Sequence, residues 1–212
     1  MTATAPGGVR GPYAKTARVR EGILAACAEV FAESGYRATT MKEIAERAGI
    51  SEGGLAHHFA GKAELLAAVL ERREKQASEA MTGARGLDGL LAMVDVVRED
   101  SLKPGIVELH STLSAEAIST EHPAHEHYRD RYHSVRRFAE LAFETLRREG
   151  ELESSLTPFE LACSYVALSD GLQIQWLYEP EAVNVDRTLR SFLASVIPRL
   201  RTSVEADEAH KW

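Results

Sequence analysis

The amino-acid sequence predicts an all-α fold of about nine helices. Apolar residues recur at steps of three and four through almost all of the 212 residues, and no convincing segment alternates apolar and polar residues as a half-buried strand would. Several helix starts are marked by prolines or by Thr-x-x-Glu capping boxes. A chain of this length can bury a core without disulfides or bound metal.

The first two helices are separated by glycine. The first helix is expected over about residues 15–34, because apolar residues recur along one face and Gly35 follows. Thr40 and Glu43 form a capping box that predicts the start of a second, short helix, which Gly49 ends.

The third and fourth helices follow without a long loop. Ser51 is suited to cap a third short helix that carries Leu55 and Phe59 on one face. A fourth helix is expected to begin near Lys62 and to continue along an apolar stripe.

Five longer helices are expected in the rest of the chain. Pro104, Pro123 and Pro158 each suit a first helical position, where a missing N–H costs nothing. Thr157 and Glu160 form a second capping box. The expected ranges are 87–102, 104–118, 123–149, 158–178 and 186–203.

Charge divides the chain into two parts. The net charge is −7, yet residues 1–64 carry eight Lys/Arg against seven Asp/Glu, which leaves seventeen against twenty-five for the remainder. An acidic body repels phosphate, so nucleic acid is expected to bind to the N-terminal part. We therefore predict a DNA-binding domain over 1–64 and a ligand-binding and dimerisation domain over 65–212, with the fourth helix bridging both.

Cysteine usage and hydropathy indicate the compartment. Cys27 and Cys163 lie far apart in apolar periodic runs and are expected to be buried small hydrophobes rather than a disulfide. No stretch approaches the ~20 apolar residues of a membrane span, and the first fifteen residues lack an apolar leader. A cytoplasmic protein without membrane contact is expected.

The second and third helices match the description of a helix-turn-helix. They are joined by Ala48-Gly49-Ile50-Ser51, a short turn that contains glycine. Periodicity alone leaves an ordinary helical corner as the alternative. The motif predicts that the helix after Ser51 is presented to the major groove.

The sequence around this motif is more specific than its geometry. The run from Gly35 to Ser51, followed by Gly53, Leu55, His57-His58-Phe59, Lys62 and Glu64-Leu65-Leu66, resembles the TetR family of bacterial regulators over about the first seventy residues. The resemblance implies a homodimeric repressor that places its third helices in successive major grooves of a palindromic operator. It also implies that a small molecule bound in the larger domain releases the DNA.

The resemblance assigns candidate DNA contacts position by position. Thr40 and Lys62 look like phosphate contacts, because each lies at a helix start. The remaining candidates on and near the helix-turn-helix are Lys42, Ser51, Glu52, Gly53, Gly54, Ala56, His57 and His58.

The third helix, which the resemblance places in the major groove, departs from the family pattern. Gly54 replaces a hydroxyl residue, Ala56 replaces a tyrosine and Glu52 places an acid beside phosphates, so the hydrogen-bonding surface is sparse. His57 is the best base-contacting candidate, and Glu52 could accept from a cytosine amine. His58 is equally suited to packing or to DNA.

A basic segment precedes the motif. Arg10, Lys15 and Arg18 could reach a phosphate or the minor groove, although a solvated terminus is an equal alternative.

The eighth helix is apolar on two faces, whereas a surface helix needs only one. We expect one face to pack inside the subunit and the other against a second copy; a fully buried helix in a monomer is the alternative. Gly171 would permit close approach. The expected dimer residues are Leu161, Tyr165, Leu168 and Leu172, with Leu189, Phe192, Val196 and Leu200 of the last helix.

Polar and aromatic side chains on inward stripes are candidates for a pocket. The candidates are His110, Leu113, Glu116, Tyr128, Tyr132, Asp170, Gln173 and Trp176. The sequence does not identify the effector, which is expected to be largely apolar, and no cofactor or metal is expected. Several of these residues could equally be plain core.

The sequence leaves two alternative functions. The histidines His110, His122, His125 and His127 could form a metal sensor. Against this, His125 and His127 fall on different helix faces, His122 could simply cap the helix that Pro123 begins, and no spaced cysteines join them. A helical-bundle enzyme is the remote alternative, because the chain lacks a nucleophile elbow, a P-loop, a dinucleotide fingerprint and a zinc-protease motif.

Overall fold

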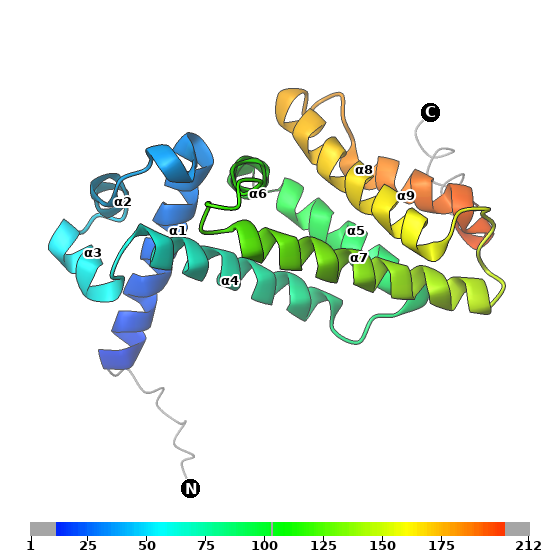
Figure 1. Ribbon diagram of the computed structural model, residues 1–212, viewed down its shortest axis with the longest axis horizontal. Coiled ribbons are helices and arrows are strands. Elements are labelled where there is room, and N and C mark those ends of the chain that lie inside the picture. The colour runs from blue at the N-terminus through cyan, green and yellow to red at the C-terminus, as the bar shows by residue number, and fades with distance from the viewer. Residues whose placement is uncertain (1–11, 103, 202–212) are drawn as a thin grey trace, which may run out of the picture.

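The computed structural model describes residues 12–102 and 104–201, with side chains from residue 16. Within these ranges the chain forms nine α-helices and one 3₁₀ turn, with no strand, which confirms the all-α class. Figure 1 shows an elongated molecule with α1 (Pro12–Ala38), α2 (Met41–Arg47) and α3 (Glu52–His58) at one end. The other helices are α4 (Lys62–Met81), α5 (Gly86–Ser101), α6 (Pro104–Glu116), α7 (His125–Arg148), α8 (Pro158–Tyr178) and α9 (Val185–Val196), followed by the turn η1 (Pro198–Leu200).

The capping signals predicted from the sequence are present. The Thr40 hydroxyl accepts from the Glu43 N–H at 3.2 Å, while the Glu43 carboxylate accepts from the Thr40 N–H at 2.7 Å. The same reciprocal pair joins Thr157 and Glu160. Ser51 Oγ accepts from the Gly54 N–H at 3.0 Å and so caps α3.

Two predicted helix ends are wrong. Helix α7 begins at His125 rather than at residue 123, because His122 Nδ1 accepts the Ala124 N–H and holds residues 122–124 as a turn. Helix α9 ends at Val196 rather than at residue 203, because Pro198 disfavours helical geometry at Ile197, which has φ −121° and ψ 97°.

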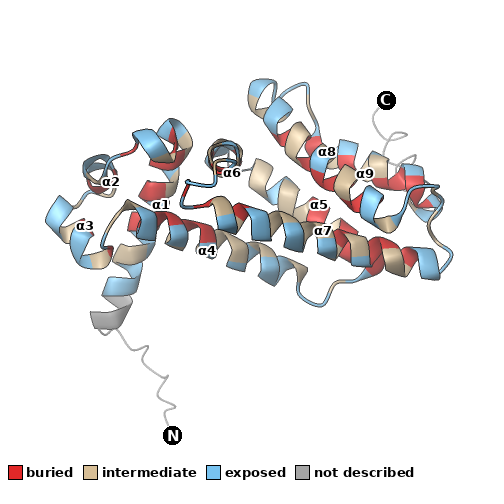
Figure 2. Ribbon diagram, in the orientation of Figure 1, coloured by how far each residue is buried: buried red, intermediate tan, exposed pale blue. Residues whose placement is uncertain are grey.

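Two hydrophobic cores lie along the molecule. The first joins α1, α2 and α3 to the N-terminal half of α4, to α6 and to the start of α7, and the second joins α5, α7, α8 and α9. Figure 2 shows buried residues along the facing sides of these helices. Leu65, Leu66 and Val69 belong to the first core, so α4 is part of the packing that holds the N-terminal helices. In the described part of the chain no helix is long and apolar enough to cross a membrane.

Candidate nucleic-acid interface and effector cavity

Helices α2 and α3 are fixed by three apolar anchors. Ile44, Leu55 and Phe59 are fully buried in the first core, where they pack with α1 and α4. Because Leu55 and Phe59 face inward, the opposite face of α3 is open to solvent. The predicted residues on that face are exposed at Ser51, Glu52, Gly53, Ala56 and His57, and half-buried at Gly54 and His58.

Arg20, which the sequence analysis did not single out, lies at the C-terminal end of α3. Its guanidinium donates to the His58 carbonyl at 3.1 Å and lies 4.0 Å from the centre of the Phe59 ring. A cation at the C-terminus of a helix is favourable, so Arg20 stabilises the end of α3. The side-chain position of His58 is also constrained by an edge-on contact with the His57 ring at 5.6 Å.

The structure corrects the predicted role of the Lys62 side chain. Its ammonium donates to the carbonyls of Tyr36 at 2.7 Å, Arg37 at 3.3 Å and Thr39 at 2.6 Å, so its three donors are used. It also lies 4.6 Å from the centre of the Tyr36 ring. Lys62 therefore holds the last turn of α1 and the start of the link to α2, instead of presenting its charge to phosphate.

The other predicted phosphate contacts differ in accessibility. Thr40 is exposed, but its hydroxyl donates to Glu43 at 2.9 Å and accepts the capping bond. Lys42 is exposed and approaches only Glu46, at 3.9 Å among the described ion pairs. Arg18 is also exposed on α1. Arg10 lies outside the described residues, and the side chain of Lys15 is likewise outside them.

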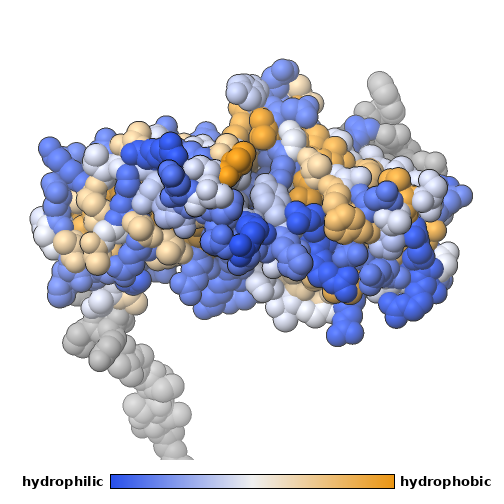
Figure 3. Space-filling view, in the orientation of Figure 1, coloured by the Kyte–Doolittle hydropathy of each residue, from blue (hydrophilic) through white to orange (hydrophobic). Residues whose placement is uncertain are grey.

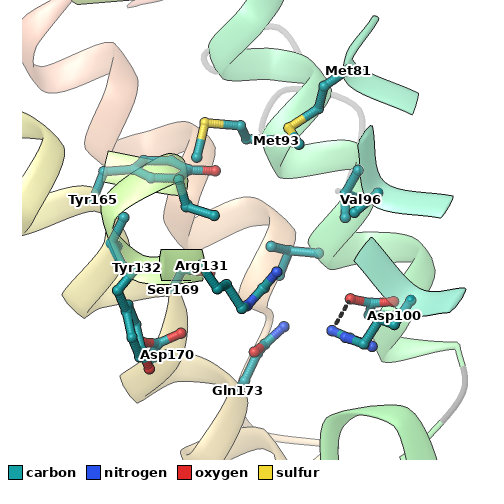
Figure 4. A pocket seen from close by; sticks show the side chains of 15 residues that line it. Met81, Met93, Val96, Asp100, Arg131, Tyr132, Tyr165, Ser169, Asp170 and Gln173 are labelled. Atoms are coloured by element: carbon teal, nitrogen blue, oxygen red, sulfur yellow. Dashed lines mark hydrogen bonds and ion pairs between the residues drawn. The ribbon is translucent and has the colours of Figure 1, made fainter. Parts of the chain in front are cut away.

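A cavity of about 60 Å³ lies between α4, α5, α7 and α8 (Figure 4). Of the predicted ligand residues, Tyr132, Asp170 and Gln173 line it. The other five predicted residues do not line this cavity and lie in the hydrophobic cores or in contacts outside it: His110, Leu113, Glu116, Tyr128 and Trp176.

Sequence reasoning missed two arginines of this cavity, Arg73 on α4 and Arg131 on α7. A signal existed, because Arg73 continues the apolar stripe of Leu66, Val69 and Leu70 at helical spacing. A charged residue on a buried stripe indicates a polar site inside the molecule. Arg73 donates to Asp100 at 2.8 Å, and Arg131 donates to Glu74 at 2.7 Å.

Asp170 connects the cavity wall to α6. Its carboxylate accepts from the Tyr132 hydroxyl at 2.8 Å and lies 3.5 Å from His110 Nε2. Burial, and next the Asp170 charge, raise the pKa of Tyr132 to about 12, so this tyrosine stays protonated and donates. Burial also lowers the pKa of His110, which favours the neutral ring.

Helix α6 in turn contacts the end of α1. The Glu116 carboxylate accepts from the Tyr36 N–H at 2.8 Å. It packs against Gly35, whose φ is 74° and where an added Cβ would lie 2.5 Å from Glu116 Oε1. The His122 ring lies edge-on to Tyr36, with centroids 5.0 Å apart. A continuous set of contacts thus runs from the cavity to the segment that precedes α2.

Residues from both apolar faces predicted for the eighth helix are buried inside the subunit, and so are most of the residues predicted for the dimer face. The prediction is wrong for five of them, because their side chains are buried in the second core formed by α5, α7, α8 and α9 and are not exposed to a second copy: Leu161, Tyr165, Leu172, Leu189 and Val196. Leu168, Phe192 and Leu200 are half-buried. The outward face of α8 instead carries Ser164, Ala167, Gly171, Ile174 and Tyr178.

The histidines considered for a metal site have separate partners. His110 faces Asp170, His122 faces Glu116, and His127 faces Glu74. His125 Nδ1 lies 2.8 Å from the Ala117 carbonyl. Among the described residues no three His, Cys, Asp or Glu side chains are grouped to hold a metal ion.

A helix-turn-helix that is anchored by buried apolar residues and exposes one face of α3, joined to a helical body, defines a DNA-binding transcriptional regulator. Residues 23–69 match the family model described as "Bacterial regulatory proteins, tetR family". The chain belongs to the TetR family.

The comparisons extend beyond the helix-turn-helix. The repressor KstR2 of Rhodococcus jostii is 29% identical over 199 residues, which cover 85% of this chain and 90% of KstR2. The regulator TtgW of Pseudomonas putida is 33% identical over 99 residues, which cover 44% of this chain and 74% of TtgW. The solved structure of SmeT, the repressor of the Stenotrophomonas maltophilia multidrug efflux pump SmeDEF, is 26% identical and covers 84% of this chain and 90% of that one, with a TM-score of 0.64.

Proposed function

We propose that this protein represses transcription by binding a palindromic operator as a homodimer in the cytoplasm, and that a small molecule entering the α4–α5–α7–α8 cavity releases it. The observation that carries this proposal is the exposed face of α3, which Leu55 and Phe59 hold in a fixed orientation. Relatives named as repressors support the direction of control, and SmeT has also been solved in a complex with triclosan.

In this proposal His57 contacts a base edge and Lys42 contacts phosphate. His57 is exposed on the outward face of α3, and Lys42 is exposed on α2, with its side chain 68% accessible. Ser51, Glu52 and the small residues of α3 complete the surface by close backbone approach. Reading the operator therefore depends on few side chains.

Two sets of contacts couple the cavity to the helix-turn-helix: helix α4, and the contacts of Asp170, His110 and Glu116 that run through α6 to the end of α1. Arg73, Ala77 and Met81 of α4 line the cavity, while Leu65 and Leu66 of the same helix lie in the core that holds α2 and α3. A displacement of α4 at the cavity therefore reorients α2 and α3. Because two α3 helices must fit two grooves at once, a small reorientation in each subunit is enough to weaken binding.

The outward face of α8 and the half-exposed part of α9 form the proposed dimer interface. Gly171 has open space around its Cα, which lets a second helix approach closely. Ile174 and Tyr178 supply exposed apolar area on the same face. Figure 3 shows hydrophobic residues gathered over the α8 and α9 half of the visible face. Closed two-fold symmetry matches the two half-sites of a palindrome.

The proposal is tested by selecting bound duplexes from a random pool. A palindromic consensus is expected, bound by twice the chain mass in light scattering. His57→Ala should reduce affinity for the consensus by roughly 1 to 3 kcal/mol and change random DNA little, whereas Lys42→Ala should weaken both and lower the salt slope. Failure to recover any preferred duplex would contradict DNA reading, and a monomer with full operator affinity would contradict the dimer.

A further inference from the structure

The cavity is divided into an apolar end and a polar end. Met81 and Met93 lie together at one end, beside the ring of Tyr165 (Figure 4). At the other end Arg131, Asp170 and Gln173 come together, near the ion pair that Asp100 makes with Arg73. A molecule that fills both ends must therefore be amphiphilic.

Arg73 has a donor that the described protein groups leave unused. Its Nη2 donates to Asp100 at 2.8 Å, but its Nη1 is buried without a hydrogen-bond partner among the described residues. A buried, charged donor without an acceptor is costly. The Nη1 amino group is therefore available for an acceptor in the cavity.

Tyr165 is the second unsatisfied group. Its side chain lines the cavity from α8 and is only 1% exposed, and its hydroxyl has no partner among the described residues. Burial raises the pKa of Tyr165, so the hydroxyl is neutral. It points toward the methionine end in Figure 4 and can meet a second polar atom of a ligand there.

The two carboxylates that line the cavity, Asp100 and Asp170, already accept hydrogen bonds. Asp100 accepts from Arg73, and Asp170 accepts from Tyr132 and lies beside His110. A cationic ligand would share a carboxylate that already faces a donor, whereas an anion meets an Arg73 amino group that has no partner among the described residues. The unsatisfied groups therefore favour an acceptor with negative charge.

We propose that the effector is an amphiphilic carboxylate, whose anionic head is bound by Arg73 and whose apolar body packs against Met81 and Met93. This inference rests on the proposed function for its regulatory meaning. The cavity of about 60 Å³ has room for only a few water molecules, so the ligand must displace the flexible methionine side chains. Met81 lies on α4, and its displacement provides the movement that releases DNA.

The test compares head groups on one apolar tail, using DNA-free protein. Octanoate, octan-1-ol and octylamine are titrated by calorimetry, with decanoate and 4-phenylbutyrate as further carboxylates. A charge-assisted hydrogen bond predicts that the best carboxylate binds at least about tenfold more tightly than octan-1-ol or octylamine.

Three variants locate the head group. Arg73→Met should remove the preference for the carboxylate. Asp100→Asn should strengthen carboxylate binding, because it removes the negative charge that competes for Arg73, and this opposite direction cannot arise from a loss of folding. Arg137→Met is the matched control on α7, because Arg137 pairs with Glu140 outside the cavity.

Equal or tighter binding of octylamine or octan-1-ol, retention of the preference in Arg73→Met, or failure of all three carboxylates to bind would each overturn the inference. Operator release is measured separately on the selected duplex. Selective carboxylate binding that leaves the operator bound would support the anion site and contradict release by a ligand in this cavity.

Discussion

Replacing Lys62 with methionine tests whether its charge serves the fold or the DNA. Methionine keeps an unbranched apolar side chain near the Tyr36 ring but removes the donors to the carbonyls of Tyr36, Arg37 and Thr39. These carbonyls lie in the last turn of α1 and in the residues that lead into α2, so losing the three hydrogen bonds is expected to loosen the start of the helix-turn-helix.

The magnitude follows from the three bonds and their exposure. A hydrogen bond to a charged group contributes roughly 1.5 to 3 kcal/mol, but Lys62 is only half-buried and water can replace much of the loss. We therefore expect the free energy of unfolding to fall by about 2 kcal/mol in total. For a chain of this size that corresponds to a melting temperature lower by roughly 4 to 8 °C.

The assay is a pair of circular dichroism melts and operator titrations over a range of salt concentrations. Lys62→Met should melt earlier and bind all duplexes more weakly, with an unchanged salt slope. Lys42→Ala is the control, because its exposed side chain should affect the salt slope and leave the melt unchanged. An unchanged melt for Lys62→Met, together with a salt slope lower by about 1 per subunit, would refute this structural role and restore a phosphate contact.

Three further predictions concern the coupling route, the cavity and pH. Gly35→Ala should destabilise the protein by about 2 to 3 kcal/mol and weaken operator binding, because the residue has positive φ and the added Cβ meets Glu116. Gly22→Ala is the control, because Gly22 lies on α1 with open space around it, and this variant should be neutral or stabilising. Equal melting temperatures for the two variants would contradict this explanation. Tyr165→Phe should raise the stability of the unliganded protein by about 1 kcal/mol, because it removes a buried hydroxyl without a partner, and a lower melting temperature would show that the hydroxyl is satisfied. The free energy of unfolding should decrease as pH falls below about 6.5, because burial lowers the pKa of His110 in the folded state while the unfolded chain takes up the proton. Thermal melts between pH 7.5 and 5.5 check this. A melting temperature that does not change over this range would mean that the folded His110 ring protonates as readily as the unfolded one.

Short-range chemistry explains why much of the fold could be predicted. Each capping box joins groups three residues apart, so Thr40 with Glu43 and Thr157 with Glu160 are readable directly from the chain. The apolar anchors of α3 follow from a spacing of four residues between Leu55 and Phe59. The fold class, the helix-turn-helix and the outward position of His57 depend on such local spacings, and the structure reproduces them.

The sequence by itself determined the helices, their caps and the exposed face of the reading helix, because those features depend on neighbours within one or two turns. Only the tertiary structure decided that residues from both apolar faces of α8 are covered inside the subunit, and it turned Tyr165 inward. It also decided that Lys62 binds carbonyls 23 to 26 residues away and that Arg73 enters the cavity. A long charged side chain pairs with groups that lie near it in space, and only the packing of the two cores brings these groups together.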